Sequence, residues 1–240
     1  MGWWSKEAVI TECFETDLHS HLLPGLDDGS KTPEETLSML RTMRDMGFKK
    51  WITTPHIFND YYRNNAEGIK NSLAALKNFL ASKGETFDIH AAAEYYLDEH
   101  LIQLLQGDKE ILTVSDRFLL FETNLFSISP FFDTMIFETG KRSLIPIMAH
   151  PERYDYVVSN KELLLSLREK GVLFQVNLLS FVDYYSVSAK KIARWMVDND
   201  LVDSVGTDLH NPRQLLALQE IMSDRYVRKL IDRPLLNLNL

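Results

Sequence analysis

Short apolar runs alternate along this chain with longer segments in which polar and apolar residues follow a helical period. The runs are rich in apolar or β-branched residues and predict seven strands, at residues 14–18, 50–54, 87–93, 117–121, 144–149, 172–177 and 203–207. Strands that alternate with helices form parallel sheets with helical crossovers. Seven such units favour closure into a barrel, and an open sheet is the alternative.

Two of the predicted helices can be assigned in detail. Thr32 is suited to cap a helix that begins at Pro33, and Gly47 can end it. A later helix is predicted from about residue 188 to 199, with apolar residues at i, i+3 and i+4. Trp195 belongs to this apolar face, so we interpret it as a core residue and not as a platform for a ligand.

Length and charge limit the classes of function. The chain has 240 residues and 27.8 kDa, which predicts one domain with a core at about 14–231 and extensions at 1–12 and 232–240. Its 34 acidic and 26 basic residues give a net charge of −8, which disfavours nucleic-acid binding and a polybasic membrane anchor. The sequence shows neither a spanning apolar segment nor a signal-peptide pattern, so we expect a cytoplasmic protein without membrane insertion.

The single cysteine, Cys13, cannot form an internal disulfide, which indicates a reducing compartment. A cysteine-dependent phosphatase needs its thiolate in a phosphate-cradling loop that ends on an arginine. Neither glycine nor arginine occurs in the six residues after Cys13. We therefore interpret Cys13 as a small apolar residue at the start of a strand and not as a nucleophile.

Histidine or carboxylate residues follow six of the seven predicted strands. The carboxyl ends of parallel strands meet on one face, so these side chains are expected to converge. The candidates are His19, His21, Asp28, His56, Glu94, Glu122, His150, Asp208 and His210. One catalytic ion needs about three or four protein ligands, so this set suits two or three ions. Imidazole and carboxylate ligands without thiolate favour Mn, Fe, Zn or Mg.

Two pairs within this set strengthen the metal hypothesis. His19 and His21 stand two residues apart, so an extended strand presents both imidazoles on the same face. Asp208 and His210 repeat this spacing near the other end of the chain. Either pair alone is a weak signal, and their occurrence at two strand ends is what favours a shared site.

Other residues of the same types are assigned different roles. His90 alternates with apolar neighbours in a predicted strand and is interpreted as structural, and His100 as a solvated helix residue. Asp17 is expected to support a ligand and not to be one. Asp27 could bind metal in place of Asp28, and the sequence leaves this choice open.

These motifs resemble those of the PHP (polymerase and histidinol phosphatase) superfamily, and most of all the bacterial PHP-type protein-tyrosine phosphatases of capsular and exopolysaccharide synthesis. The resemblance extends from about Thr16 to Pro212. The segments that carry it are DLHSHLLPGLDDG at 17–29, TPH at 54–56, AEY at 93–95, AHPERY at 149–154 and GTDLHN at 206–211. Carboxylates at Asp28 and Glu122, where other branches tend to have histidine, favour the tyrosine-phosphatase branch. The sequence FETN at 121–124 departs from the Glu-Phe-Pro often found there.

The resemblance implies a single-domain α/β fold, a distorted seven-stranded (β/α)7 PHP-type barrel, with a trinuclear and often manganese-dependent centre. It implies hydrolysis of phosphotyrosine on the phosphorylated tail of a bacterial tyrosine autokinase. It also implies the ligand sets: His19, His21, Glu94 and Asp208 for one ion, Asp28, His56 and His210 for a second, and Glu122 and His150 for a third, with Glu94 bridging.

Residues near these motifs are candidates for catalysis and substrate binding. We expect a metal-bridging hydroxide to attack phosphorus in line, with His150 and Arg153 as catalytic residues. The guanidinium of Arg153 suits bidentate phosphate binding, and the alternative is a salt bridge to a neighbour. Arg213 is a second candidate for phosphate binding. Tyr61 and Tyr62 could form walls for the substrate ring or pack their loop on the barrel rim.

Two other classes of function remain as alternatives. One is a PHP phosphoesterase that acts on a small phosphate such as histidinol phosphate. The other is a non-catalytic module that binds a phosphorylated kinase tail. The complete set of candidate ligands argues against the non-catalytic module.

Overall fold

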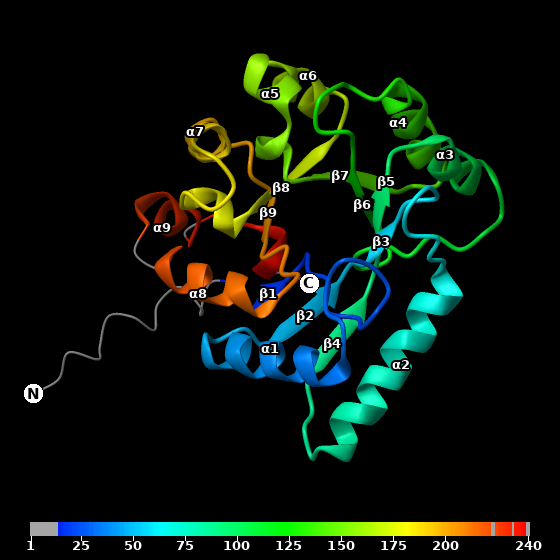
Figure 1. Ribbon diagram of the computed structural model, residues 1–240. Helices are drawn as coiled ribbons and strands as arrows, with labels where there is room; N and C mark the ends of the chain where they lie inside the picture. The colour runs from blue at the N-terminus through cyan, green and yellow to red at the C-terminus, as the bar shows by residue number, and fades with distance from the viewer. Residues whose placement is uncertain (1–13, 222–223, 232, 239–240) are drawn as a thin grey trace, which may run out of the picture.

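The strands of the computed structural model form two parallel sheets (Figure 1). The structure describes residues 14–221, 224–231 and 233–238, so Cys13 lies outside the described residues. One sheet has the order β1-β2-β4 and the other has the order β3-β5-β6-β7-β8-β9. Their bounds are β1 Thr16–Asp17, β2 Lys50–Thr53, β3 His56–Ile57, β4 Asp88–Ala91, β5 Glu94–Tyr96, β6 Phe118–Glu122, β7 Ile145–Ala149, β8 Leu173–Asn177 and β9 Ser204–Gly206.

All seven predicted strands occur, and two short strands that were not predicted, β3 and β5, follow just beyond the predicted ranges 50–54 and 87–93. Thr54 and Pro55 separate β2 from β3, and Ala92 and Ala93 separate β4 from β5. Pro55 has no N–H to donate to a sheet ladder, which accounts for the first break. After the breaks, β3 and β5 pair with each other in the second sheet, with His56 opposite Glu94. The expected seven-stranded closed barrel is therefore not confirmed, and the sheets curl into a half-barrel.

The edge between β1 and β9 is joined by a few specific contacts. Ser20 and Leu209 form an isolated parallel bridge just beyond the two strands. Nearer the strand starts, the side chain of Asn237 accepts from the Val205 N–H at 2.9 Å and donates to the carbonyl of Thr16 at 2.8 Å. Asn237 lies in the 3-10 turn η3 (Leu236–Leu238). The C-terminal segment, which the sequence left without a role, thus adds hydrogen bonds to those that join this edge directly, from Asp208 N–H to the His19 carbonyl and from His21 N–H to the Leu209 carbonyl.

Helices surround the outside of the curved sheets (Figure 1). They are α1 Pro33–Asp45, α2 Ala66–Ser82, α3 Glu99–Gln106, α4 Phe132–Lys141, α5 Asp155–Ser159, α6 Leu163–Glu169, α7 Val187–Asp198, α8 Pro212–Ile221 and α9 Arg225–Ile231, with 3-10 turns η1 Pro151–Arg153 and η2 Leu178–Phe181. The predicted start of α1 is confirmed, because the Thr32 side chain accepts from the Glu35 N–H. Trp195 is partly buried against the core, as predicted. None of the helices in the described residues is long and apolar enough to cross a membrane.

The inner face of the sheets changes from apolar to polar along the strands. In β6, Phe118 and Leu120 belong to a small inner apolar cluster, whereas Leu119 and Phe121 face the larger core under the helices. Because strand side chains alternate, Glu122 returns to the inner face at the carboxyl end of β6. The apolar cluster therefore fills the inner face below the carboxyl ends of the strands, and those ends can present polar side chains.

Candidate metal centre

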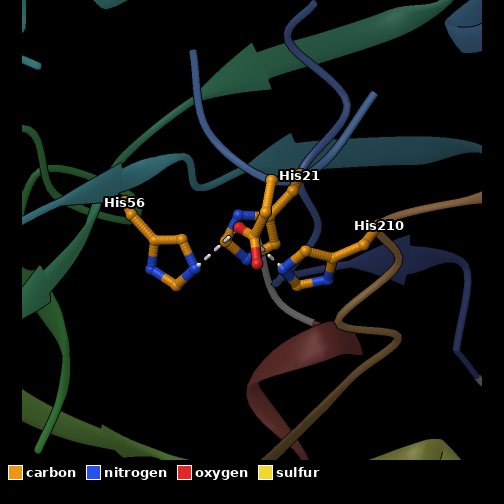
Figure 2. Close-up of side chains that lie close together, drawn as sticks. His21, His56 and His210 are labelled. Atoms are coloured by element: carbon orange, nitrogen blue, oxygen red, sulfur yellow. Dashed lines mark ion pairs between the residues drawn. The ribbon is translucent and has the colours of Figure 1, made fainter. Parts of the chain in front are cut away.

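Eight of the nine predicted ligands lie at or just beyond strand ends, and Asp28 lies in the loop after β1. The side chains of seven of them form overlapping groups, and His150 and Asp208 contact members of these groups. Three groups place ligand atoms within 4.8 Å of one another: His21, Asp28, His56 and His210; His19, His21 and Glu94; and His56, Glu94 and Glu122. Figure 2 shows the rings of His21, His56 and His210 converging from three different segments of the chain. Six strand ends thus contribute to one cluster, as the alternation of strands and helices predicted.

Glu94 is the central carboxylate of this cluster. Its Oε2 lies 3.2 Å from His19 Nε2, 3.4 Å from His21 Nε2 and 3.1 Å from His56 Nδ1, and its Oε1 lies 3.0 Å from His150 Nε2. The side chain is fully buried, yet Oε2 has no hydrogen-bond partner among the described residues. A buried carboxylate oxygen without such a partner is costly unless a cation satisfies it. The residues therefore fit divalent metal ions.

The electrostatics of Glu94 agree with a cation at this position. Burial raises the pKa of the Glu94 carboxyl, but the imidazoles of His19 and His56 outweigh burial and hold that pKa well below its usual range. Burial lowers the pKa of His56, and the carboxylates of Glu94, Asp28 and Glu122 together outweigh that effect and raise the pKa well above its usual value. The pocket therefore favours a carboxylate with positive charge around it, which protons or divalent ions can supply.

The two candidate aspartates of the first loop have distinct positions. Asp28 is half-exposed, and its Oδ1 lies 3.5 Å from Nε2 of both His56 and His210. Asp27 is buried and accepts from His21 Nδ1 at 2.8 Å, with further bonds from the N–H groups of His56 and Gly29. Asp28 thus faces the cluster, and Asp27 orients a candidate ligand.

Asp208 reaches the cluster with one oxygen and is anchored by the other. Its Oδ1 lies 3.5 Å from His19 Nε2, His21 Nε2 and His210 Nδ1. Its Oδ2 accepts from Arg153 at 2.8 Å. The backbone at Asp208 has φ of 50°, and His150 has φ of 35°. Non-glycine residues rarely adopt this region, and such strain is concentrated at functional sites.

The remaining predicted ligands are arranged differently from the expected sets. Glu122 Oε1 lies 3.1 Å from His56 Nδ1, and these two residues form their group with Glu94. His150, expected as the partner of Glu122, reaches the cluster through its contact with Glu94. Nδ1 of His56 faces Glu94, and its Nε2 faces Asp28. The ring therefore belongs both to the group with Glu94 and Glu122 and to the group with Asp28 and His210.

The predicted accessory residues lie at varied distances from the cluster. Arg153 pairs with Asp208, and its guanidinium carbon lies 4.5 Å from the centroid of the Tyr185 ring. Arg213 is exposed beside the last motif. The ring of Tyr62 stacks on His56 at 5.3 Å and 13°, whereas Tyr61 is 75% exposed.

The residues that we assigned to other roles lie outside the three groups. Asp17 accepts from the N–H and hydroxyl of Thr207, the residue before Asp208, which is the supporting role expected of it. His90 is exposed and pairs with Asp88 at 2.7 Å, so its assignment as a structural residue is not supported. His100 is partly buried in α3.

Sequence reasoning missed two supporting residues, Gln175 and Asn177. Gln175 Oε1 lies 2.7 Å from His19 Nδ1, and Asn177 Nδ2 donates to Asp208 at 2.7 Å. The available signal was a pair of polar residues, two positions apart, in an otherwise apolar strand end.

Curated relatives resemble this chain along most of its length. It is 28% identical over 214 residues to the putative tyrosine-protein phosphatase CapC of Staphylococcus aureus, covering 88% of this chain and 84% of that protein. It is 26% identical to the tyrosine-protein phosphatase YwqE of Bacillus subtilis, covering 81% and 77% of the two chains. It is also 26% identical to the tyrosine-protein phosphatase CpsB of Streptococcus pneumoniae, covering 91% and 96%.

A solved structure shares the fold. It belongs to the crystallographic work on YwqE from Bacillus subtilis and CpsB from Streptococcus pneumoniae, described there as unique metal-dependent tyrosine phosphatases. It matches this chain with a TM-score of 0.80 and 23% identity, covering 90% of this chain and 89% of that one. The family model for capsular polysaccharide synthesis, CpsB/CapC, matches residues 15–232, which include every candidate ligand of the cluster. The chain therefore belongs to the CpsB/CapC family of capsular polysaccharide synthesis.

Proposed function

We propose that this protein is a metal-dependent protein-tyrosine phosphatase that acts in the cytoplasm on the phosphorylated tail of a tyrosine autokinase of capsular or exopolysaccharide synthesis. The family match and the names of the curated relatives support the reaction and its biological setting. The observation that carries the proposal is Glu94, whose buried Oε2 faces three imidazoles within 3.4 Å without a hydrogen-bond partner among the described residues.

We assign the candidate ligands to two or three divalent ions, with manganese as the proposed metal. His19, His21, Glu94 and Asp208 would hold one ion, and Asp28, His56 and His210 a second. Glu122 and His150 would hold a third, with Glu94 shared between sites. The overlap of the three groups at His21, His56 and Glu94 supports neighbouring ions that share ligands. Ions bound there supply an activated water and neutralise phosphate charge.

Arg153 is the proposed phosphate-binding residue of the protein itself. Its side chain is 28% exposed beside the cluster, and Asp208 holds it in place. A guanidinium carries five N–H donors in a planar fork, so one edge can hold Asp208 while another meets a phosphate oxygen. Arg213 is proposed as a second, outer contact for the phosphate.

Tyr62 is the proposed contact for the aromatic ring of the substrate. Its own ring is fixed by stacking on His56, at the border of the cluster. Tyr61 is exposed next to it and packs on Phe58, with ring centroids 4.9 Å apart. Phosphotyrosine leaves as a phenolate with a pKa near ~10, so the reaction needs less proton donation than an alkyl phosphate would.

The proposal is tested by comparing substrates and variants of the full chain. The manganese-loaded protein is assayed for phosphate release from a phosphotyrosine peptide and from histidinol phosphate. We expect the peptide to be preferred, chelation to abolish its hydrolysis, and a thiol-alkylating reagent to leave it intact.

Two histidine variants complete the test. His150→Ala should lose peptide hydrolysis and part of the bound metal, because His150 contacts Glu94. His90→Ala is the matched control, since His90 is exposed and pairs with Asp88 away from the cluster. Preference for histidinol phosphate would favour the small-phosphate alternative. Bound metal and bound peptide without phosphate release would favour the non-catalytic module.

A further inference from the structure

Strand β8 supplies no candidate ligand, yet its inner face links two of them. Gln175 Oε1 lies 2.7 Å from Nδ1 of His19, and Gln175 Nε2 donates to Asn177 Oδ1 at 3.0 Å. Asn177 Nδ2 then donates to Asp208 Oδ2 at 2.7 Å. His19 and Asp208 come from opposite ends of the sequence, so two amide side chains of one strand connect the first ligand motif to the last.

The direction of every hydrogen bond in this chain of contacts follows from its last member. The carboxylate of Asp208 can only accept, so Asn177 must offer its amide N–H₂ and keep its oxygen for Gln175. Gln175 then donates through its own N–H₂ and keeps its oxygen for His19. An oxygen that only accepts requires a proton on His19 Nδ1. In the neutral ring, which is the form that binds a metal ion, the other nitrogen, Nε2, then carries no proton, and it faces Glu94 at 3.2 Å.

The packing around the two amides holds them in one arrangement. Both side chains are essentially buried, and the intervening Val176 faces the core on the other side of the strand. Gly206 of β9 leaves space for Gln175 and His19, because a Cβ there would lie 2.6 Å from His19 Cβ and 2.9 Å from Gln175 Nε2. The backbone N–H of Asn177 is held in addition by Glu152 at 3.0 Å. A well-packed, fully bonded polar chain of this kind fixes the geometry of the groups at its ends.

We propose that Gln175 and Asn177 are positioning residues that set the tautomer of His19 and the orientation of Asp208 for metal binding. This inference rests on the proposed function, because it needs the cluster to bind divalent ions. Supporting residues beyond the ligands typically change metal affinity by 10–100-fold. Gln175 acts through His19 and does not touch the substrate or the metal.

The test compares manganese affinity among variants of the full chain after chelator treatment and dialysis. Gln175→Leu removes both hydrogen bonds at similar volume and should weaken binding about 10–100-fold. Gln175→Glu keeps an acceptor for His19 Nδ1 and should retain affinity within about tenfold of the wild type. Circular dichroism confirms that each variant is folded.

Asn237→Leu is the matched control for the loss of a buried amide. Asn237 makes three hydrogen bonds, all to backbone atoms of Thr16 and Val205. This variant should be less stable than the wild type but should bind manganese with unchanged affinity in its folded form.

A second measurement uses the wild-type protein, so it does not depend on whether a Gln175 variant folds. Ring ¹⁵N NMR of the wild-type protein loaded with zinc should show the His19 proton on Nδ1 and the metal on Nε2. The reverse pattern would overturn the inference, and so would a Gln175→Leu protein that binds manganese as tightly as the wild type. If the wild type itself binds no divalent ion, the proposed function and this inference both fall. If the wild type binds manganese and the Gln175→Leu protein binds it equally tightly, this inference falls but the proposed function stands.

Discussion

Removing Asp27 and removing Asp28 should have opposite signatures, although the two residues are adjacent. Asp27 accepts three hydrogen bonds, from His21 Nδ1 at 2.8 Å, Gly29 N–H at 2.9 Å and His56 N–H at 3.0 Å. Asp28 is half-exposed and faces only the cluster, at 3.5 Å from His56 and His210. Asp27→Ala should therefore destabilise the metal-free fold more than Asp28→Ala, because the imidazoles of His210 and His56 also lower the pKa of Asp28 but solvent screens that half-exposed carboxylate.

The cost of Asp27→Ala can be worked out in two ways. A buried donor left without a partner costs about 1–3 kcal/mol, and three donors are affected, of which entering water can satisfy some. Burial raises the pKa of Asp27, but His21 outweighs it, and the pKa falls from 3.8 to about 2. At 1.36 kcal/mol per pH unit, the charged form alone contributes about 2 kcal/mol. The two estimates both include the contact with His21 and are therefore not added, so we expect a loss of about 2–5 kcal/mol.

Urea unfolding of the chelated proteins at neutral pH measures this difference. A carboxyl with a lowered pKa stabilises the fold above its unfolded value of 3.8 and loses that effect as the pH falls toward 2. The difference in unfolding free energy between wild type and Asp27→Ala should therefore lose its charge-dependent part as the pH falls from 3.8 toward 2. Manganese titration should show the effect of Asp28→Ala, which is expected to bind one of the ions more weakly than the wild type does. The reasoning is refuted if Asp27→Ala costs less than about 1 kcal/mol, or if Asp28→Ala destabilises the metal-free fold equally.

Substitutions at four further positions test other parts of the site. Glu94→Gln keeps the shape but removes the charge that faces four imidazoles, so metal content and phosphotyrosine hydrolysis should fall about 100-fold or more. Normal hydrolysis would contradict a central role. Arg153→Ala should lower kcat/KM for the peptide by about 100-fold while metal content is kept, and unchanged turnover would exclude it from phosphate binding. Tyr62→Ala should raise KM about fivefold through the lost stacking surface, whereas Tyr62→Phe should not. Gly206→Ala should cost about 1–3 kcal/mol in a denaturation experiment, because its Cβ would overlap His19.

Seven of the strands could be predicted from the sequence because each lies in or beside a short apolar run between helical segments, whereas the short strands β3 and β5 were not predicted. The break at Pro55 has a visible cause in the sequence, since proline lacks the N–H that a ladder needs. The break between β4 and β5 falls at Ala92 and Ala93, which are ordinary strand residues, so no local pattern marks it. The contact of β1 with β9 is supported by Asn237, whose hydrogen bond to Thr16 spans most of the chain and leaves no periodic signal in the sequence.

The convergence of the candidate ligands could also be predicted, because strand ends of a parallel sheet share one face. Which candidate ligands share a group could not be predicted in full, because this depends on the orientation of individual imidazole rings. His56 directs its two nitrogens to different groups, which spacing in the sequence does not encode. Asp27 and Asp28 lie in a loop where strand alternation no longer applies, so only the structure separates the supporting residue from the one that faces the cluster.

The central claim is that the cluster around Glu94 binds the ions on which phosphotyrosine hydrolysis depends. The most direct measurement titrates manganese into the chelated wild-type protein and follows bound manganese and phosphate release from a phosphotyrosine peptide in the same samples. We predict that the chelated protein releases no phosphate, and that release recovers as two or three ions bind per chain. Phosphate release at the full rate by the metal-free protein would contradict the claim.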